Sequence, residues 1–468
     1  MQESWSSVVQ TIPYLLTPQL LTPQLLNMYK KHFLLITRLG FPIVVAQLGT
    51  IVTGFADTIM VGQYGTNELS AAGFTNNVFG LIIYFLLGFS YSTTPVVGAF
   101  YGQGRYADAA RSLKESLVAN MGACAVVLAL MTVLYFNLHL LGQPEELLPL
   151  IAPYYLVVLA SMPFVSAFNA LKQFCDGVGD TKMPMWVMIG GNVMNIIVNY
   201  LLIFGKMGCP ELGLVGAGVA TLTSRVFMVV ALLVVLLKSK RYEAYLDGLR
   251  LPFTSRGVKH LTRKGMPIGL QMCMEASSFS LCAVMMGWLG SAPLAAHQVM
   301  CTIGSLCFMV YYGIGAAVAI RISHFRGQGN WGEVRLVANV GLLMTLSTGV
   351  LLSTMIFLLR YDISYMFTTS EEVVAVVVSL IVPMMFYQLG DCIQTVFANA
   401  LRAIEDVKMM MFYAFIAYVV VSLPLSYVFG FILGWGAVGV WWAFPFGLTT
   451  AGVLFWTRFN KTTWQKCR

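Results

Sequence analysis

Long apolar runs separated by short polar segments recur along the whole chain of 468 residues. A helix needs about 20 mostly apolar residues to cross the roughly 30 Å hydrocarbon layer of a bilayer, and these runs reach that length. We therefore predict an all-α polytopic membrane protein with twelve transmembrane helices. The predicted helices cover residues 38–62, 74–101, 114–137, 148–172, 183–204, 214–237, 262–288, 296–322, 335–358, 373–400, 408–430 and 437–457.

Glycine and polar positions recur at an offset of 225 residues, so that residues 37–105 align with residues 262–330 without a gap. Gly40, for example, corresponds to Gly265. A repeat of this length in an apolar chain is typical of transporters built from two similar halves with the transport site between them. The alternative is a duplicated scaffold without a pathway. Six spans in each half is an even number, which predicts two six-helix lobes related by a pseudo-two-fold axis along the membrane normal.

The repeat divides the chain into four predicted segments. The first segment contains the tandem sequence LLTPQ-LLTPQ, whose prolines interrupt a continuous helix, and it lacks the features of a signal peptide. We expect it to be a short, dispensable cytoplasmic or interfacial extension. The segments are an N-terminal extension (1–30), an N-lobe with helices 1–6 (31–237), a cytoplasmic linker loop (238–261) and a C-lobe with helices 7–12 and a short tail (262–468).

Lysine and arginine are distributed unevenly between the two sides of the predicted membrane. If the N-terminus is cytoplasmic, 25 of the 28 fall on the inner side; the exceptions are Lys206 and Arg360 in outer loops and Arg225 within a span. The positive-inside rule therefore predicts that both termini are cytoplasmic. The net charge of +8 reflects this topology, and we expect no nucleic-acid partner.

Composition and motifs exclude several other classes of protein. The chain is 58% hydrophobic and 10% charged, against about 25% charged residues in soluble domains. Its nine cysteines are dispersed, which argues against a disulfide framework or a zinc site. Walker A, HExxH and GxSxG motifs are absent from the sequence. We therefore expect no enzyme activity and no cofactor, and a transporter of this kind must be driven by an ion gradient or by its substrate's own gradient.

Three carboxylates lie well inside predicted spans, whereas the other seventeen Asp and Glu residues lie in loops or at helix ends. They are Asp57, Glu275 and Asp391. Each costs about 2.5–3.5 kcal/mol at a helix centre, and such residues usually line polar cavities that carry ions or protons. The alternative is a structural carboxylate paired with a neighbouring helix. Arg225 is the one base inside a predicted span, so it neutralises one acid at most. Arg225 either takes part in transport or is a structural residue, namely a partner within its own lobe or a snorkelling side chain.

Polar side chains accompany these acids at helical spacing. The fifth predicted helix carries a stripe of three asparagines, and the tenth carries a tyrosine, a glutamine and a threonine on the face of its carboxylate. Their oxygens suit Na⁺ or a hydrogen-bonded protonatable acid, although asparagines also join helices without any further role. The residues are Asn192, Asn195 and Asn199 in the fifth helix, and Tyr387, Gln394 and Thr395 in the tenth.

Four motifs resemble the multidrug and toxic compound extrusion (MATE) family, in the right order over nearly the whole chain. They are GFADTIMVGQYG (54–65), LAAHQV (294–299), YQLGDCIQ (387–394) and NALRAIEDVK (399–408). The buried acids are most similar to the bacterial norfloxacin-efflux branch. This resemblance implies two six-helix bundles in a V that open alternately to the two sides. It also implies an N-lobe cation site at Asp57, Asn195 and Asn199, and a C-lobe cation site at Glu275, Asp391 and Tyr387.

We therefore expect an antiporter of the bacterial inner membrane that functions as a monomer and exports organic cations or amphipathic drugs in exchange for Na⁺ or H⁺. Two nearby carboxylates cannot both ionise cheaply unless a cation lies between them or one keeps its proton. We accordingly hypothesise a Na⁺ site at Glu275, Asp391 and Tyr387 and a proton site at Asp57. The alternatives are a flippase for lipid-linked precursors, expected to line its cavity with cations, and an ion channel, for which no filter sequence is present.

Overall fold

The computed structural model describes residues 23–467, which are almost entirely helical. Twelve helical segments in this range are long and apolar enough to cross a membrane, as predicted. The first half consists of α3 (Pro23–Tyr64), α4 (Thr66–Ser90), α5 (Thr93–Gly102), α6 (Tyr106–Phe136), α7 (Leu148–Gly177), α8 (Lys182–Ile203) and α9 (Gly213–Lys238). The second half consists of α11 (Ser255–Leu289), α12 (Ser291–Gly327), α13 (Trp331–Leu358), α14 (Arg360–Phe367), α15 (Glu371–Ala403), α16 (Val407–Ala414), α17 (Leu423–Tyr427) and α18 (Gly436–Cys467).

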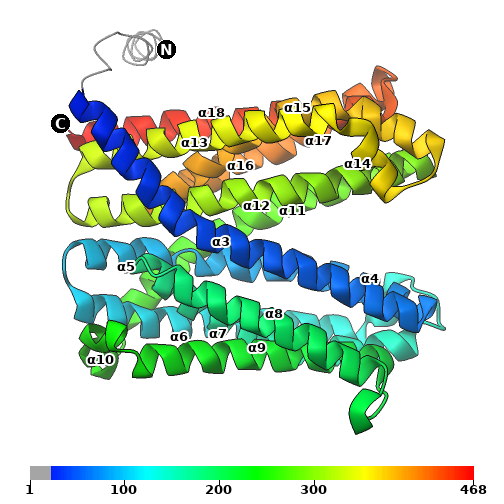
Figure 1. Ribbon diagram of the computed structural model, residues 1–468, viewed down its shortest axis with the longest axis horizontal. Coiled ribbons are helices and arrows are strands. Elements are labelled where there is room, and N and C mark those ends of the chain that lie inside the picture. The colour runs from blue at the N-terminus through cyan, green and yellow to red at the C-terminus, as the bar shows by residue number, and fades with distance from the viewer. Residues whose placement is uncertain (1–22, 468) are drawn as a thin grey trace.

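The helices form two lobes that lie side by side, with α3 running diagonally along the boundary between them (Figure 1). The start of α3 and the end of α18 lie at the same end of the molecule, which we call the termini end (Figure 1). The largest hydrophobic core is built mainly from α11 to α18 and includes Ile36 and Ile43 of α3. Two smaller cores lie in the first half, and a small one joins α4, α6 and α11. The two-lobe, all-α architecture confirms the predicted fold class.

The two lobes meet through close contacts that obey the sequence repeat. A Cβ on Gly102 would meet the backbone of His324, and a Cβ on Gly327 would meet the backbone of Ala99; each residue of one contact is offset by 225 from its equivalent in the other. In a two-fold symmetric pair, a residue of the first half that contacts a residue of the second half has an equivalent in the second half that makes the same contact with the first. The internal repeat therefore acts as a pseudo-dimer, with its interface near the termini end.

Glycines also allow α3 and α12 to cross closely. A Cβ on Gly40 would lie 2.9 Å from the carbonyl oxygen of Gly313, closer than real Cβ contacts allow. The symmetry-equivalent crossing joins α11 to α4, where a Cβ on Gly265 would lie 2.8 Å from the carbonyl oxygen of Phe89. The packing of the lobes at these two crossings explains why glycine stands at the repeated positions.

Several helices differ from their predicted extents. Helix α3 begins at Pro23, inside the predicted extension, because proline is tolerated in the first turn of a helix. The second predicted helix is divided into α4 and α5 by a turn at Tyr91–Ser92. The eleventh span contains two stretches of wider π-helical turns, η5 (Phe415–Ser422) and η6 (Val428–Ile432). The rest of the predicted extension lies outside the described residues.

The predicted linker loop is largely helical and packs on the first lobe. It contains α10 (Glu243–Arg250), and α11 begins at Ser255, before the predicted end of the linker. The backbone amide of Thr254 donates a hydrogen bond of 3.0 Å to Glu115 on α6, and the Tyr242 hydroxyl donates one of 2.8 Å to Asp180. These contacts attach the connection between the lobes to the first lobe.

Candidate functional site in the two lobes

In the first lobe, Asp57 lies half-buried on α3 and faces α8. The side-chain amide of Asn199 donates one hydrogen bond to Asp57 Oδ1 and another, of 3.1 Å, to Asn195 Oδ1. Both asparagines are buried, because their four-residue spacing places them on the face of α8 that packs against α3. The structure thus brings together the three residues expected to form the N-lobe site.

Arg225 reaches the same region from α9. Its guanidinium donates a hydrogen bond to the hydroxyl of Ser161 on α7, and it lies within electrostatic range of Asp57. The Tyr154 hydroxyl donates a 3.3 Å hydrogen bond to Asn76 close by. Arg225 is therefore a partner internal to the first lobe, and the acid of this lobe has a cationic neighbour.

Asn192 is separate from this network. Its amide nitrogen is buried without a hydrogen-bond partner in the described structure and lies against Gly49, where an added Cβ would be 3.0 Å away. Asn199 Oδ1 is likewise buried and unpaired. Unpaired buried polar atoms are costly, so both amides lie where a further hydrogen-bond partner would stabilise the protein.

In the second lobe, Glu275 on α11 and Asp391 on α15 are connected through two polar side chains. Gln394 Nε2 donates to Glu275 Oε2 at 3.5 Å, and the Thr395 hydroxyl lies 3.1 Å from Asp391 Oδ1 and 3.2 Å from Gln394 Oε1. Gln394 also donates to the Tyr418 hydroxyl at 2.8 Å. Asp391 is 2% exposed, and its Oδ2 has no partner within residues 23–467. The predicted grouping of two acids with a glutamine and a threonine is present.

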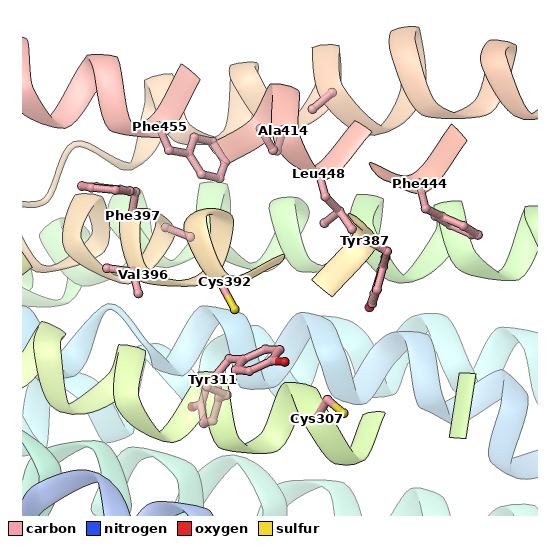
Figure 2. Close-up of a cluster of buried hydrophobic side chains, with 14 of the residues drawn as sticks. Cys307, Tyr311, Tyr387, Cys392, Val396, Phe397, Ala414, Phe444, Leu448 and Phe455 are labelled. Carbon is pink, nitrogen blue, oxygen red and sulfur yellow. The ribbon is translucent and has the colours of Figure 1, made fainter. Parts of the chain in front are cut away.

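Tyr387 lies one turn before Asp391, but its hydroxyl makes no hydrogen bond to either acid in the described part of the chain. Its ring packs edge-on against Phe279, Phe444 and Trp441, with centroid separations of 6.2 Å. Figure 2 shows Tyr387 beside Phe444 and Leu448, on the side of the cluster formed by α15 and α18. The hydroxyl oxygen is therefore left available rather than already bound to a carboxylate.

Arg402, which lies beyond the end of the predicted tenth helix, is connected to Glu275 through Gln271. Helix α15 continues to Ala403, beyond its predicted end, and this buries Arg402 to 7% exposure. Its Nη2 donates to Gln271 Oε1 at 2.7 Å, and Gln271 Nε2 donates to Glu275 Oε2 at 2.8 Å. Arg225 is therefore not the only base near the intramembrane acids of residues 23–467: Arg402, beyond the end of the predicted tenth helix, and Lys172 are both buried.

Arg402 also contacts the first lobe. Its guanidinium carbon lies 5.3 Å from the ring centroid of Tyr91, within the range of a cation–π interaction. Tyr91 in turn makes a 2.6 Å hydrogen bond between hydroxyls with Tyr312 on α12. A continuous set of contacts therefore runs from Glu275 through Gln271 and Arg402 to the interface of the lobes.

A second ionic cluster lies at the termini end, in the turn between α15 and α16. Glu405 pairs with Arg326 at 2.5 Å, with His260 at 3.0 Å and with Lys264 at 3.5 Å. Burial alone would raise the pKa of Glu405, but the hydrogen bond from His260 and the charge of Arg326 outweigh burial and hold that pKa below its usual range. The cluster joins α11, α12 and α15 within the second lobe.

These arrangements limit the chemistry of the site. Within residues 23–467, no three His, Cys, Asp or Glu side chains are grouped as metal ligands. A cation bound in the second lobe would therefore rely on two carboxylates together with hydroxyl and amide oxygens, the hard donors that Na⁺ and similar ions take. The orphaned Asp391 Oδ2 and the free Tyr387 hydroxyl fit such an ion. The sequence contained a signal for Gln271, which lies one helical turn before Glu275, but none for Tyr418.

Comparison with known proteins identifies the fold. The MatE family model matches residues 42–201 and, a second time, residues 267–428. The two matches correspond to the two lobes and together cover more than half of the chain. The chain belongs to the MatE family. The expected family and its transporter fold are therefore confirmed, and the repeat found in the sequence is the repeat of the family model.

Similar proteins cover nearly the whole chain. The multidrug resistance protein NorM of Vibrio cholerae serotype O1 is 30% identical over an alignment of 441 residues that covers 92% of this chain and 96% of NorM. The crystal structure of the Vibrio cholerae MATE transporter VcmN has a TM-score of 0.85 at 19% identity and covers 94% of this chain and 98% of its own. A Pyrococcus furiosus transporter of the MOP superfamily, described as having a binding pocket of reverse polarity, has a TM-score of 0.82 at 18% identity, with 93% and 97% coverage. This MatE fold alone therefore does not fix the charge of the pocket, which has to be read from the side chains.

Proposed function

We propose that this MatE protein is a secondary active multidrug exporter of the bacterial inner membrane, which exchanges organic cations or amphipathic drugs for Na⁺ or H⁺. The observation that carries the proposal is the set of carboxylates inside both lobes, with Glu275 and Asp391 joined in one buried network. Acidic groups favour cationic substrates and coupling ions, whereas a flippase for pyrophosphate-linked lipids would need cations at the same depth. The name of the relative NorM, a multidrug resistance protein, supports the same substrate class.

The driving force is sufficient for such export. A cation that crosses the full membrane field gains about 2.3 kcal/mol per 100 mV, and a tenfold concentration gradient adds about 1.4 kcal/mol. One ion therefore supplies roughly 4 kcal/mol, enough for on the order of 10³-fold accumulation of a neutral compound outside. Cation binding neutralises a carboxylate and weakens its hold on a cationic drug, so the same acids serve drug and ion in turn.

The two lobes differ in what they offer an ion. The second lobe provides two acids, the Thr395 hydroxyl and the free Tyr387 hydroxyl, which together suit Na⁺. The first lobe provides the single acid Asp57 beside an asparagine and within range of Arg225, an arrangement that suits a proton. We assign Na⁺ to the second lobe and H⁺ to the first. The termini end, where the positive charges gather, faces the cytoplasm.

Neutral variants of the acids test the exchange mechanism. Asp57→Asn, Glu275→Gln and Asp391→Asn should each reach the membrane in normal amounts but lose most drug export, because an amide cannot exchange an ion for a cationic drug. Asp247→Asn is the matched control, since the Asp247 side chain is 90% exposed on α10. Each variant is expressed in separate cells. Normal drug resistance with any two of the three variants would contradict the mechanism, provided that cells with the control variant are also resistant.

The assignment of ions has its own test in proteoliposomes with each gradient imposed separately. Tyr387→Phe should weaken Na⁺-driven export and leave proton-driven export, while Asn199→Ala should do the reverse. Binding of Na⁺ to purified protein should disappear in the Glu275→Gln, Asp391→Asn double variant. Full Na⁺ binding in that double variant would exclude the second lobe as the Na⁺ site.

A further inference from the structure

A groove of about 440 Å³ lies on the outside of the molecule where the two lobes join, between α6 and α11. Its apolar lining comes from both lobes and from the connection between them. Val118 on α6 is 40% exposed, Phe253 before α11 is 53% exposed and Met266 on α11 is 41% exposed. The groove thus leaves apolar surface uncovered within the protein itself.

Two cations line the same groove, Lys259 and Arg263 on α11. Their four-residue spacing places them one above the other on one face of the helix. Both are exposed, and neither makes an ion pair or a hydrogen bond in the described part of the chain. On the adjoining face of α11, His260 and Lys264 stand at the same spacing but both pair with Glu405.

The position of the groove along α11 shows at which depth in a membrane it lies. The first ten residues of the helix, SRGVKHLTRK, are rich in basic side chains, and the ten that follow, GMPIGLQMCM, are mostly apolar. The groove lies across this boundary, with Lys259 and Arg263 on the charged side and Met266 on the apolar side. Such a boundary matches the level at which lipid headgroups meet acyl chains.

We propose that this groove binds one anionic phospholipid of the leaflet that surrounds the termini end. Its phosphate is held by Lys259 and Arg263, its acyl chains leave over Met266 on the apolar side of the boundary, and its glycerol region lies against Val118 and Phe253. Basic pockets between membrane helices recognise anionic headgroups in this way. A soluble anion would use the two charges but leave the apolar lining uncovered, and a cationic drug would be repelled by them.

Occupancy of the groove bears on the conformation of the transporter. Val118 belongs to the first lobe, whereas Lys259, Arg263 and Met266 belong to the second. A lipid that contacts both therefore holds the lobes together at the termini end and favours the closed arrangement of that end. The proposal concerns a lipid ligand outside the transport site, and it does not depend on which ion drives export.

Lipid titration of the delipidated, full-length protein, followed by native mass spectrometry, tests the proposal. The Lys259→Gln, Arg263→Gln double variant should bind phosphatidylglycerol about 25-fold more weakly than the wild type, since each cation contributes about fivefold. Phosphatidylcholine should bind weakly to both proteins. The matched control is Lys461→Gln, Lys466→Gln, which removes two exposed lysines of α18 at the same end.

The control should bind phosphatidylglycerol as the wild type does, and inorganic phosphate in millimolar excess should not displace the lipid. An equal loss of affinity in both double variants would show general surface attraction and overturn the proposal. Equal binding of the two lipids by the wild type, or full displacement by phosphate, would overturn it as well. Each variant's melting temperature in zwitterionic detergent should equal that of the wild type, because the four side chains are exposed.

Discussion

Replacement of Arg402 should open the termini end of the protein, because this side chain links the acids of the second lobe to the first lobe. Its guanidinium donates to Gln271, which donates to Glu275, and it lies 5.3 Å from the ring centroid of Tyr91 across the interface. When the lobes separate, the contact with Tyr91 is lost, whereas the bond to Gln271 stays within the second lobe. The free energy of the Arg402–Tyr91 interaction therefore determines how far the substitution shifts the equilibrium between the closed and open states of the termini end.

The size of the effect follows from burial. Arg402 and Tyr91 are each 7% exposed, and a desolvated cation–π interaction is worth about 2 kcal/mol. Arg402→Gln should therefore shift the population toward the open termini end by about 30-fold. Tyr91→Phe keeps the ring but loses the hydroxyl that bonds Tyr312, worth about 1 kcal/mol or fivefold. Tyr91→Leu loses both interactions, and its shift should exceed that of either other variant.

Spin labels at Gln103 and Gln328 provide the measurement. These two residues are exposed, lie at the termini end and are equivalent in the repeat, so the distance between them reports separation of the lobes. In a cysteine-free background, pulsed electron paramagnetic resonance should detect a long-distance population that grows from wild type to Tyr91→Phe to Arg402→Gln to Tyr91→Leu. Bound Na⁺ should change this population in the wild type but much less in Arg402→Gln.

Arg360→Gln is the control variant. Arg360 also lies over an aromatic ring, 4.7 Å from the centroid of Phe357, but on an exposed surface away from the interface. Its distance distribution should match that of the wild type. Unchanged distributions in both Arg402→Gln and Tyr91→Leu would refute the link between the acids and the interface.

Four further substitutions probe packing, charge and topology. Gly313→Val should abolish closure and export, since a Cβ there would collide with Val44 and lie 3.2 Å from the Gly40 carbonyl oxygen; the same label pair should show the open state, and a closed distribution would contradict the packing argument. Glu405→Gln should lower the melting temperature at pH 7, and the difference from the wild type should shrink as the pH falls. The pKa of Glu405 is lower in the folded than in the unfolded protein, so the ionised carboxylate stabilises the fold above about pH 4.3 and this stabilisation is lost on further acidification. A gap that widens in acid would exclude this source of stability. Cysteines replacing Met207 and Arg250 should react with impermeant reagents from outside and from inside respectively, and labelling of position 250 from outside would reverse the proposed orientation.

Much of the architecture was predictable because membrane insertion imposes simple rules on sequence. Each span has to bury about 20 apolar residues, so twelve runs gave twelve helices. The repeat implied two lobes, and the matches of the MatE model to residues 42–201 and 267–428 follow the same division. The helix ends were less predictable. Polar residues continue α15 and α18 past the apolar runs, because backbone hydrogen bonding does not stop where hydrophobicity stops.

The acids Asp57, Glu275 and Asp391 were evident from the sequence itself, since a carboxylate inside an apolar helix is costly and therefore conspicuous. Their spacing also placed Asn195 with Asn199, and Thr395 with Asp391, because residues four apart share a helix face. Contacts between distant segments were not determined in this way. Only the tertiary structure placed Arg402 beside Gln271 and Tyr91, left the Tyr387 hydroxyl away from the acids and joined α6 to α11 around the groove. The periodicity of the sequence determines which side chains share one face of a helix. Which side chains of different helices meet depends on how the helices rotate and cross, and close packing at residues such as Gly40 sets that arrangement.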